Sequence, residues 1–265
     1  MIRHEAFPSR LVMPRHVDVW LPPDYNAEPA RRYPVLYLHD GQNCFDPKDC
    51  AFGVAWEVQH ALLRLVMAGE ARPAILVGVW NVEPLRLMDY RPARPFHYLS
   101  ERARTLVTAG MGGMPQSDAY LAYLVRELKP FIDLTYRTRP GRDDTFIMGS
   151  SMGGLISLYA LCEYPEVFGS AACVSTHWPA VEGVIAPYLR DTLPPPGTHR
   201  LYFDHGTETL DALYAPIQAE VDGAMAAAGY TRGRDWLTLP FPGARHFEKD
   251  WQERVHIPLR FLLAA

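Results

Sequence analysis

A sharp turn between a buried strand and a helix is the feature that constrains this chain most. Residues 145–149 have the sequence TFIMG, a nearly continuous apolar run that is typical of a strand buried on both faces. The sequence GSSMG of residues 149–153 overlaps its end, and a helical pattern begins near Met152 without a linker. A strand that leads directly into a packed helix is the repeating unit of a parallel sheet with crossover helices. The segment therefore predicts an α/β architecture.

The same alternation of strand-like and helical patterns continues along most of the chain, and it predicts a mostly parallel sheet with helices on both faces. The expected strands are His16–Leu21, Tyr33–His39, Ala74–Trp80, Thr145–Gly149, Gly169–Ser175, Arg200–His205 and Trp236–Phe241. The expected helices are Ser117–Ile132, a segment from about Met152, a segment around Ile217–Met225, and Trp251–Leu263. The first strand alternates polar and apolar residues, so it is expected to be antiparallel and half exposed. Pro258 should bend the last helix or set its start.

Two segments interrupt the alternation. Residues 81–116 contain several prolines and the glycine-rich stretch 110–113, and residues 178–198 are proline-rich. We interpret both as long excursions above the sheet, and the aromatic content of the first favours a functional role. The length of 265 residues fits one large domain, so residues 1–265 are expected to form a single unit.

Charge and composition exclude several classes of function. With 26 basic and 30 acidic residues and no basic stripe, the chain is not expected to bind nucleic acid. No apolar run approaches the roughly 18 residues of a spanning helix, and residues 1–10 do not resemble a signal peptide, so no membrane partner and a cytoplasmic location are expected. The four cysteines form no CxxC motif and are expected to be reduced thiols. The composition is compatible with a homo-oligomer.

Gly149 to Gly153 match the GxSxG pattern, in which a serine on a strained strand-to-helix turn exposes its hydroxyl group. With Ser151 at the centre, glycines occupy both flanking positions, where a side chain would collide with the neighbouring strand or helix. With Ser150 at the centre, methionines would stand there. The pattern alone arises by chance in about one chain in ten of this size, as a simple glycine turn. The strand before it and the helix after it favour Ser151 as a nucleophile.

A serine nucleophile needs an imidazole to accept its proton and a carboxylate to orient that imidazole. When the serine lies on such a turn, the acid and then the histidine follow it along the chain. His246 lies in a loop after the last expected strand, whereas His256 lies among helical residues and fits a packing role. Asp211 is the preferred acid because it lies far enough beyond the sixth strand for a loop to turn back. Glu208 remains the alternative, and Asp204 within that strand is a weaker choice.

Acyl transfer through a serine also needs hydrogen-bond donors for the oxyanion of the tetrahedral intermediate. The backbone amide of Met152 is the first by position. The loop after the strand Tyr33–His39 is expected to supply the second from Gln42, because Gly41 lets the backbone turn there. The alternative is a simple glycine turn in which Asp40 binds local amides.

Four segments together resemble the putative-esterase family of α/β-hydrolases, which includes enterochelin esterases, feruloyl esterases and mycolyltransferases. They are YPVLYLHDGQNCFD, IMGSSMGGLISLYALCEYPEVFG, LYFDHGTETLD and the GxxH at Gly243 to His246. The resemblance covers roughly residue 33 to the C-terminus. It implies an α/β-hydrolase fold, a Ser-acid-His triad, a small-molecule ester substrate, and no metal or other cofactor. By motif position it implies the same roles for Ser151, His246 and the amides of Met152 and Gln42, and less directly for Asp211, since the acid varies in this family.

Residues that follow the strand ends are expected to contact the substrate, because ligands bind at that edge of parallel sheets. The candidates are Asp40, Trp80, Arg86, Tyr90, His177 and Trp178. Aromatic walls with a few arginines would suit a planar or anionic acyl group such as a catecholate or hydroxycinnamate. Each of these residues is as compatible with loop packing as with substrate contact.

The sequence thus predicts a serine hydrolase that cleaves carboxylic esters through an acyl-enzyme. Acyl transfer and thioester hydrolysis proceed through the same acyl-enzyme, and the sequence does not separate them. A catalytically silent binding protein of the same fold is disfavoured because candidates for nucleophile, base and acid are all present. Metal-dependent hydrolysis is disfavoured because no HExxH or comparable spacing occurs.

Overall fold

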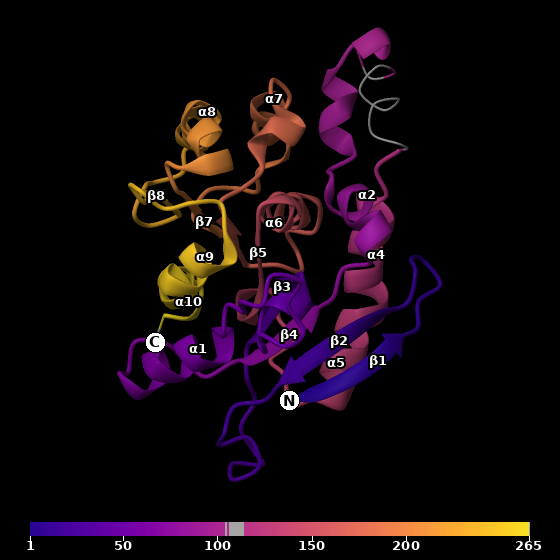
Figure 1. Ribbon diagram of the computed structural model, residues 1–265, viewed down its shortest axis with the longest axis vertical. Coiled ribbons are helices and arrows are strands. Elements are labelled where there is room, and N and C mark those ends of the chain that lie inside the picture. Colours follow the sequence, from indigo (N-terminus) through magenta and orange to yellow (C-terminus); the bar gives the residue numbers. More distant parts are fainter. Residues whose placement is uncertain (104, 106–113, 265) are drawn as a thin grey trace.

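The computed structural model describes residues 1–103, 105 and 114–264, and eight strands of this part form one sheet (Figure 1). The strands are β1 (Ile2–Phe7), β2 (Arg15–Trp20), β3 (Val35–His39), β4 (Ile75–Val79), β5 (Thr145–Ser150), β6 (Ser170–Val174), β7 (Arg200–His205) and β8 (Trp236–Pro240). Their order in the sheet is β1-β2-β4-β3-β5-β6-β7-β8. The pairs β1/β2 and β2/β4 are antiparallel, and every pair from β4 to β8 is parallel. The predicted α/β class and the antiparallel direction of the early strand are confirmed. The expectation that this strand is half exposed is wrong, because β2 lies between β1 and β4 and none of its residues is exposed.

Helices connect the parallel strands. The α-helices are α1 (Val58–Met67), α2 (Arg86–Tyr90), α4 (Ser117–Tyr123), α5 (Lys129–Thr135), α6 (Met152–Glu163), α7 (Ile185–Thr192), α8 (Tyr214–Ala227), α9 (Glu248–Arg254) and α10 (His256–Leu263). The shorter turns are η1 (Gly41–Asn43), η2 (Glu83–Leu85), η3 (Arg94–Tyr98), η4 (Leu124–Leu128), η5 (Arg142–Asp144), η6 (Trp178–Val181) and η7 (Thr209–Leu213). In the described part of the chain, none of these helices has the length and apolar character that crossing a membrane requires.

Side chains of the central strands alternate between two hydrophobic cores, one on each face of the sheet. In β3, Val35 and Tyr37 belong to the core shared with α4 to α8, whereas Leu36 and Leu38 belong to the core shared with α1, α9 and α10. Figure 1 shows the same division, with α1 and α10 on one side of the sheet and α4 and α5 on the other. Every residue of β3 to β6 is buried, which accounts for their nearly continuous apolar sequences.

Prolines set the boundaries of two helices. Pro130 lies in the first turn of α5, where its missing N–H is tolerated, and the π-helical turn η4 runs directly into that helix. Together α4, η4 and α5 form the helical stretch expected from Ser117. Pro258 lies in the first turn of α10, so it sets the start of that helix as predicted, and α9 precedes it as a separate helix.

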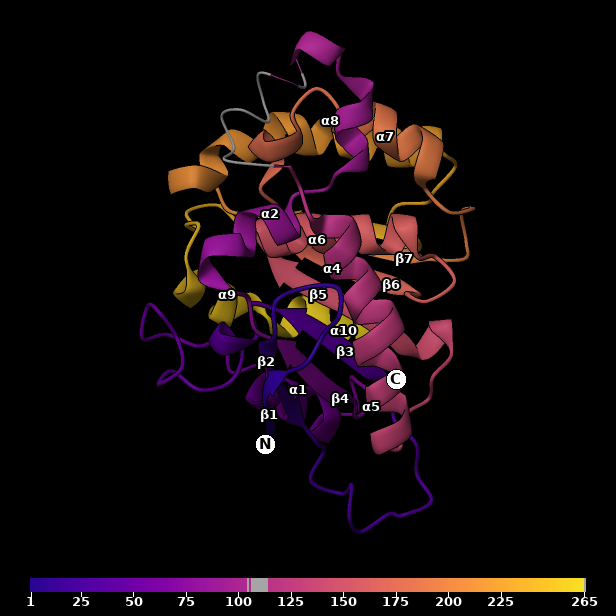
Figure 2. The same cartoon turned by 90° about the vertical axis from the view of Figure 1, so that its right-hand side faces the viewer.

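The second expected excursion is partly helical, which corrects the interpretation of residues 178–198 as irregular. Ile185, Tyr188 and Leu189 are buried on one face of α7, which packs against α8. Figure 2 shows both helices in one layer above the end of the sheet. Pro179 and Pro187 lie in the first turns of η6 and α7, where proline is tolerated, and the three prolines 194–196 follow α7 in the loop that leads to β7. In the first excursion the structure has η2, α2 and η3, and the glycine-rich stretch 110–113 lies outside the described residues.

Close backbone packing shapes the turn between β5 and α6. Ser151 adopts φ 56° and ψ −122°, a conformation that non-glycine residues rarely adopt. A Cβ atom on Gly149 would lie 2.7 Å from the backbone carbonyl of Gly153. A Cβ atom on Gly153 would lie 3.3 Å from the Cβ of His39, which is tight but less severe. The steric requirement predicted for both flanking positions is therefore strict at Gly149 and mild at Gly153.

We expect Gly149→Ala to lower the free energy of unfolding by about 2 kcal/mol or more, because the added methyl group displaces the first turn of α6 from β5. Urea denaturation would measure the loss. Gly141→Ala is the matched control, since a Cβ atom there meets nothing within 4 Å and the residue is exposed. Equal stability of the Gly149 and Gly141 variants would contradict the steric argument.

Candidate active site

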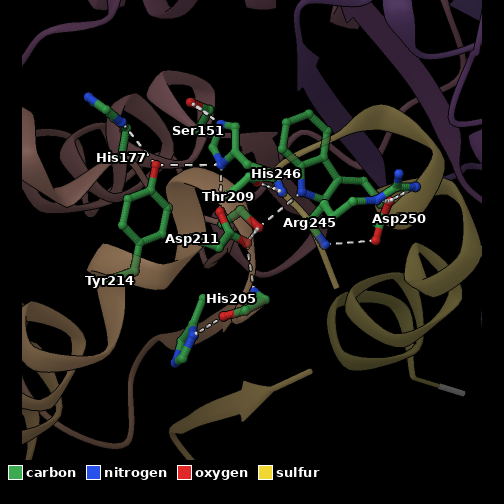
Figure 3. Close-up of polar contacts among 12 residues, drawn as sticks. Ser151, His177, His205, Thr209, Asp211, Tyr214, Arg245, His246 and Asp250 are labelled. Carbon is green, nitrogen blue, oxygen red and sulfur yellow. Dashed lines mark hydrogen bonds and ion pairs between the residues drawn. The ribbon is translucent and has the colours of Figure 1, made fainter. Parts of the chain in front are cut away.

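Three side chains form a continuous hydrogen-bonded row at the carboxyl edge of the sheet (Figure 3). Oγ of Ser151 lies 2.9 Å from Nε2 of His246, and Nδ1 of the same imidazole lies 2.5 Å from Oδ1 of Asp211. Ser151 stands on the turn after β5, Asp211 lies in η7 after β7, and His246 lies in the loop after β8. Because parallel strands end at the same edge, these three loops converge although the residues lie far apart in sequence.

Three donors surround the buried carboxylate of Asp211. Its Oδ2 accepts hydrogen bonds of 2.6 Å from the Ser175 hydroxyl and 2.6 Å from the Gly206 amide, while Oδ1 faces His246. Burial acts to raise the pKa of Asp211, but the hydrogen bonds from His246, Ser175 and Gly206 outweigh it and hold the pKa below its ordinary value. An ionised carboxylate only accepts hydrogen bonds, so Nδ1 of His246 carries the proton and Nε2 is free to accept from Ser151.

The structure brings Asp211, and not Glu208, to the histidine. Glu208 is exposed, and within the described residues no hydrogen bond joins its side chain to His246. Its loop is held by the backbone instead, since the amides of Thr207 and Glu208 both bond to the carbonyl of Ala244. Gly206 permits this approach, because a Cβ atom there would lie 2.1 Å from that carbonyl oxygen.

Aromatic side chains hold the imidazole of His246 from two sides. The rings of Trp251 and Tyr214 meet it nearly perpendicularly, with centroids at 4.9 and 5.7 Å. The Tyr214 hydroxyl lies 3.5 Å from Nδ1 of His246 and 2.9 Å from Nδ1 of His177. Burial, together with the repulsion that a protonated His246 would exert, lowers the pKa of His177 to about 4, so this second imidazole is neutral near pH 7. No sequence pattern indicates that Tyr214 contacts two histidines.

The two backbone amides predicted as oxyanion donors both lie near the start of a helical turn. Met152 is the first residue of α6 and Gln42 lies in η1, and backbone N–H groups in the first turn of a helix have no acceptor within it. The expected reason for Gly41 needs correction. The residue with the left-handed conformation is Asp40, at φ 54°, and a Cβ atom on Gly41 would lie 2.5 Å from the backbone of Gly78. Glycine is required at position 41 by this close approach to β4.

An ion pair between the partly exposed Arg86 and the buried Asp40 anchors the loop that carries Gln42. Arg86 binds both carboxylate oxygens of Asp40, with distances of 2.8 and 2.7 Å, and the Asn81 amide donates a third hydrogen bond of 2.6 Å. Burial acts to raise the pKa of Asp40, but Arg86 and Asn81 outweigh it and lower the pKa. The carboxylate is therefore ionised, and the charge of Arg86 is balanced within the protein.

A cavity of about 430 Å³ opens beside Ser151. Its lining consists of Asp40, Gln42, Asn43, Ala51, Phe52, Asn81, Glu83, Arg86, Leu87, Ser150, Ser151, His246, Phe247, Glu248 and Trp251. Phe52 and Leu87 are 60% and 57% exposed, so apolar surface is presented to a ligand. Among the described residues of this lining, Arg86 is the only arginine or lysine, and Asp40 already pairs with it. Burial raises the pKa of Glu248.

Four of the expected substrate contacts lie outside this lining. Trp178 is fully buried in the core and donates a 3.1 Å hydrogen bond to Gln218, and Tyr90 is buried with its hydroxyl 3.2 Å from the amide of Asp40. The indole N–H of Trp80 binds Asp18, 2.8 Å away. His177 contacts Tyr214 instead of the cavity. Trp80 follows β4, His177 and Trp178 follow β6, and Tyr90 ends α2. The side chains of these four residues contact other parts of the protein, whereas Asp40 and Arg86 line the cavity.

Residues 1–103, 105 and 114–264 contain no candidate metal centre. In that part of the chain no three His, Cys, Asp or Glu side chains are grouped so that they could hold a metal ion.

Comparison with known proteins identifies a family and similar solved structures. Residues 9–256 match the model of a family described as "Putative esterase". An uncharacterised protein, YbbA of Bacillus subtilis, is 27% identical over 244 residues, which cover 89% of this chain and 87% of the relative. A solved ferulic acid esterase superposes with a TM-score of 0.72 at 20% identity, covering 99% of this chain and 97% of the other. An IroE-like serine hydrolase from Shewanella oneidensis gives a TM-score of 0.73 at 19% identity, covering 99% and 79%. The two structures share the α/β-hydrolase fold with this chain.

Proposed function

Because the chain belongs to the Putative esterase family, we propose that it hydrolyses carboxylic esters through an acyl-enzyme formed on Ser151. The family and its esterase relatives support ester hydrolysis in general. The observation that carries the serine mechanism is the row of hydrogen bonds from Ser151 through His246 to Asp211. A hydroxyl, an imidazole and a carboxylate in this order are the groups that acyl transfer through serine needs.

In the proposed mechanism Ser151 attacks the ester carbonyl while Nε2 of His246 takes the hydroxyl proton. The amides of Met152 and Gln42 stabilise the oxyanion of the tetrahedral intermediate. The C–O bond to the alcohol then breaks, and His246 returns its proton to the departing alkoxide. Water attacks the acyl-enzyme in the same manner, with His246 again as base, and releases the carboxylic acid. Asp211 keeps the imidazole in the required tautomer and stabilises its charged form.

The cavity beside Ser151 favours an ester whose larger part is uncharged and aromatic or apolar. Phe52, Leu87, Phe247 and Trp251 provide apolar lining, which would suit a planar ring such as that of a hydroxycinnamate. The charge of Arg86 is balanced by Asp40, while Glu83 adds an exposed carboxylate. The expectation of an anionic acyl group therefore loses the support that Arg86 gave it.

We expect Ser151→Ala to lower kcat for an aryl ester by a factor on the order of 10⁶, because no acyl-enzyme forms without the nucleophile. A fluorophosphonate should label the wild-type protein once, at Ser151, and should not label the variant. Ser150→Ala is the matched control and should keep labelling. Ester hydrolysis that survives Ser151→Ala would rule out the proposal.

We expect Asp211→Asn to lower kcat by about 10⁴-fold, because an amide at this position favours the wrong imidazole tautomer. Glu208→Gln, which makes the same change on the exposed neighbour, should leave kcat within about twofold. Steady-state kinetics on one aryl ester would compare the two variants. A larger loss in the Glu208 variant would transfer the role of acid to Glu208.

We expect a neutral aryl butyrate to be hydrolysed with at least about tenfold higher kcat/KM than the corresponding aryl hemisuccinate, which places a carboxylate in a cavity that already contains acidic groups. Glu83→Gln should narrow this ratio. Glu220→Gln is the control, since Glu220 is exposed on α8 and lies outside the cavity lining. Preference for the hemisuccinate would contradict the proposed substrate class.

A further inference from the structure

The carboxylate of Asp211 is connected to a second buried carboxylate through Ser175, the residue that follows β6. The Ser175 hydroxyl lies 2.6 Å from Oδ2 of Asp211, and its amide lies 3.1 Å from Oδ1 of Asp204. Nη2 of Arg254 lies 2.8 Å from the same hydroxyl and 3.1 Å from Oδ1 of Asp204. The side chains of Asp204 and Asp211 are 0% exposed and that of Arg254 is 6% exposed. A buried cation and two buried carboxylates thus meet at one serine, Arg254 and Asp211 at its hydroxyl and Asp204 at its amide.

The proton of the Ser175 hydroxyl can point only toward Asp211. A serine hydroxyl has one proton to donate and two lone pairs to accept with. The indole Nε1 of Trp251, 3.0 Å away, and Nη2 of Arg254 both donate to it, and neither group can accept. Both lone pairs are therefore in use, and the remaining bond is the donation to Asp211.

This donation helps to fix the plane of the Asp211 carboxylate relative to His246. The terminal torsion of an aspartate is broad, so the side chain itself does not fix the carboxylate plane. Ser175 and the amide of Gly206 both bind Oδ2, which leaves Oδ1 for His246. Without the Ser175 hydroxyl, the amide of Gly206 alone would bind Oδ2 of Asp211.

Arg254 is held in its turn by a separate set of contacts. Its guanidinium lies over the ring of Phe241, 4.9 Å from the centroid, and pairs with Asp204, whose other oxygen accepts a 2.9 Å hydrogen bond from Tyr202. Trp251 and Arg254 both belong to α9. The helix therefore delivers two donors to Ser175 from one face.

We propose that Ser175 and Arg254 are positioning residues of the reaction, which act through Asp211 by locking its carboxylate toward His246. The inference rests on the proposed function, because it requires Asp211 to serve as the acid of the triad. Through these two residues, α9 and the end of β6 contribute to the orientation of Asp211, although Arg254 touches none of the reacting groups.

Ser175→Ala is the cleanest test, because it removes the hydroxyl and leaves the pair of Arg254 and Asp204 intact. We expect kcat to fall about tenfold or more, with KM changed by less than about twofold, since a charge-assisted hydrogen bond is lost away from the substrate. Fluorophosphonate labelling of Ser151 should slow by a similar factor. Ser170→Ala removes another buried serine hydroxyl at the opposite end of β6 and should leave both rates unchanged.

A double-mutant cycle separates positioning from general structural damage. If Ser175 acts through Asp211, then Ser175→Ala should have little further effect on kcat in an Asp211→Asn background. A loss of kcat that is equally large in both backgrounds would overturn the inference, because it would mean that Ser175 acts independently of Asp211.

Arg254 requires a paired variant, because Arg254→Met alone would leave Asp204 buried without its cation and could prevent folding. In Arg254→Met/Asp204→Asn both charges are removed, and we expect kcat to fall about tenfold, with KM nearly unchanged. Arg254→Lys keeps a cationic donor and should recover part of the loss. Wild-type kcat in the paired variant and in Ser175→Ala, alongside an impaired Asp211→Asn, would overturn the inference and leave the proposed function standing. Hydrolysis that survives Ser151→Ala would instead remove the proposed function itself.

Discussion

The backbone conformation of Ser151 is the constraint on which the site depends. At φ 56° and ψ −122° the residue is strained, and such a conformation persists only where its surroundings determine it fully. The Ser151 amide donates to the carbonyl of Val174 over 2.9 Å, and its carbonyl accepts from the amides of Leu155 and His177, both at 3.1 Å. The strand β5, the helix α6 and the segment after β6 thus hold the turn together, and the absence of a side chain on Gly149 lets them approach.

The end of β6 connects this turn to the rest of the site. Val174 holds the backbone of Ser151, while the next residue, Ser175, binds the carboxylate of Asp211. Ser175 itself has a positive φ of 40°, so two strained serines stand on neighbouring strands at the same edge of the sheet. In the proposed mechanism this arrangement fixes the distance between nucleophile and acid, and the imidazole of His246 fits between them.

Much of the fold could be predicted from the sequence, because buried strands and amphipathic helices have distinct local patterns. The strands β2 to β8 and the helices α6 and α8 all follow such patterns. The short strand β1 was missed, since it is largely exposed and has little apolar content. The helix α1 was missed although Val58, Ala61, Leu62 and Leu65 recur at helical spacing, and α7 was missed because prolines surround it. Residues 178–198 were interpreted as a loop because they are rich in proline, although the buried residues of α7 recur at helical spacing.

Side-chain contacts between distant segments were harder to predict, and the aromatic residues show why. Trp80, Tyr90 and Trp178 follow strand ends, which made them candidates for substrate contact. Whether a residue at a strand end faces a cavity or the core depends on helices that come later in the chain, as when α8 supplies Gln218 to the buried indole of Trp178. The position of a residue at the end of a strand determines the edge of the sheet at which it lies, but not whether its side chain points into the cavity or into the core.

Two arginines illustrate what such distant contacts do for this site. Arg86 binds Asp40 beside the proposed oxyanion loop, and Arg254 binds Asp204 behind the proposed acid. Buried ion pairs contribute little net stability, because removing both charges from water offsets most of their attraction. Their effect here is geometric. Arg86 fixes Asp40 and with it the loop that carries Gln42, while Arg254 is fixed by Asp204 and so holds the Ser175 hydroxyl. Apolar residues of similar volume could fill the same space, but they would leave the Gln42 loop and the Ser175 hydroxyl without a defined orientation.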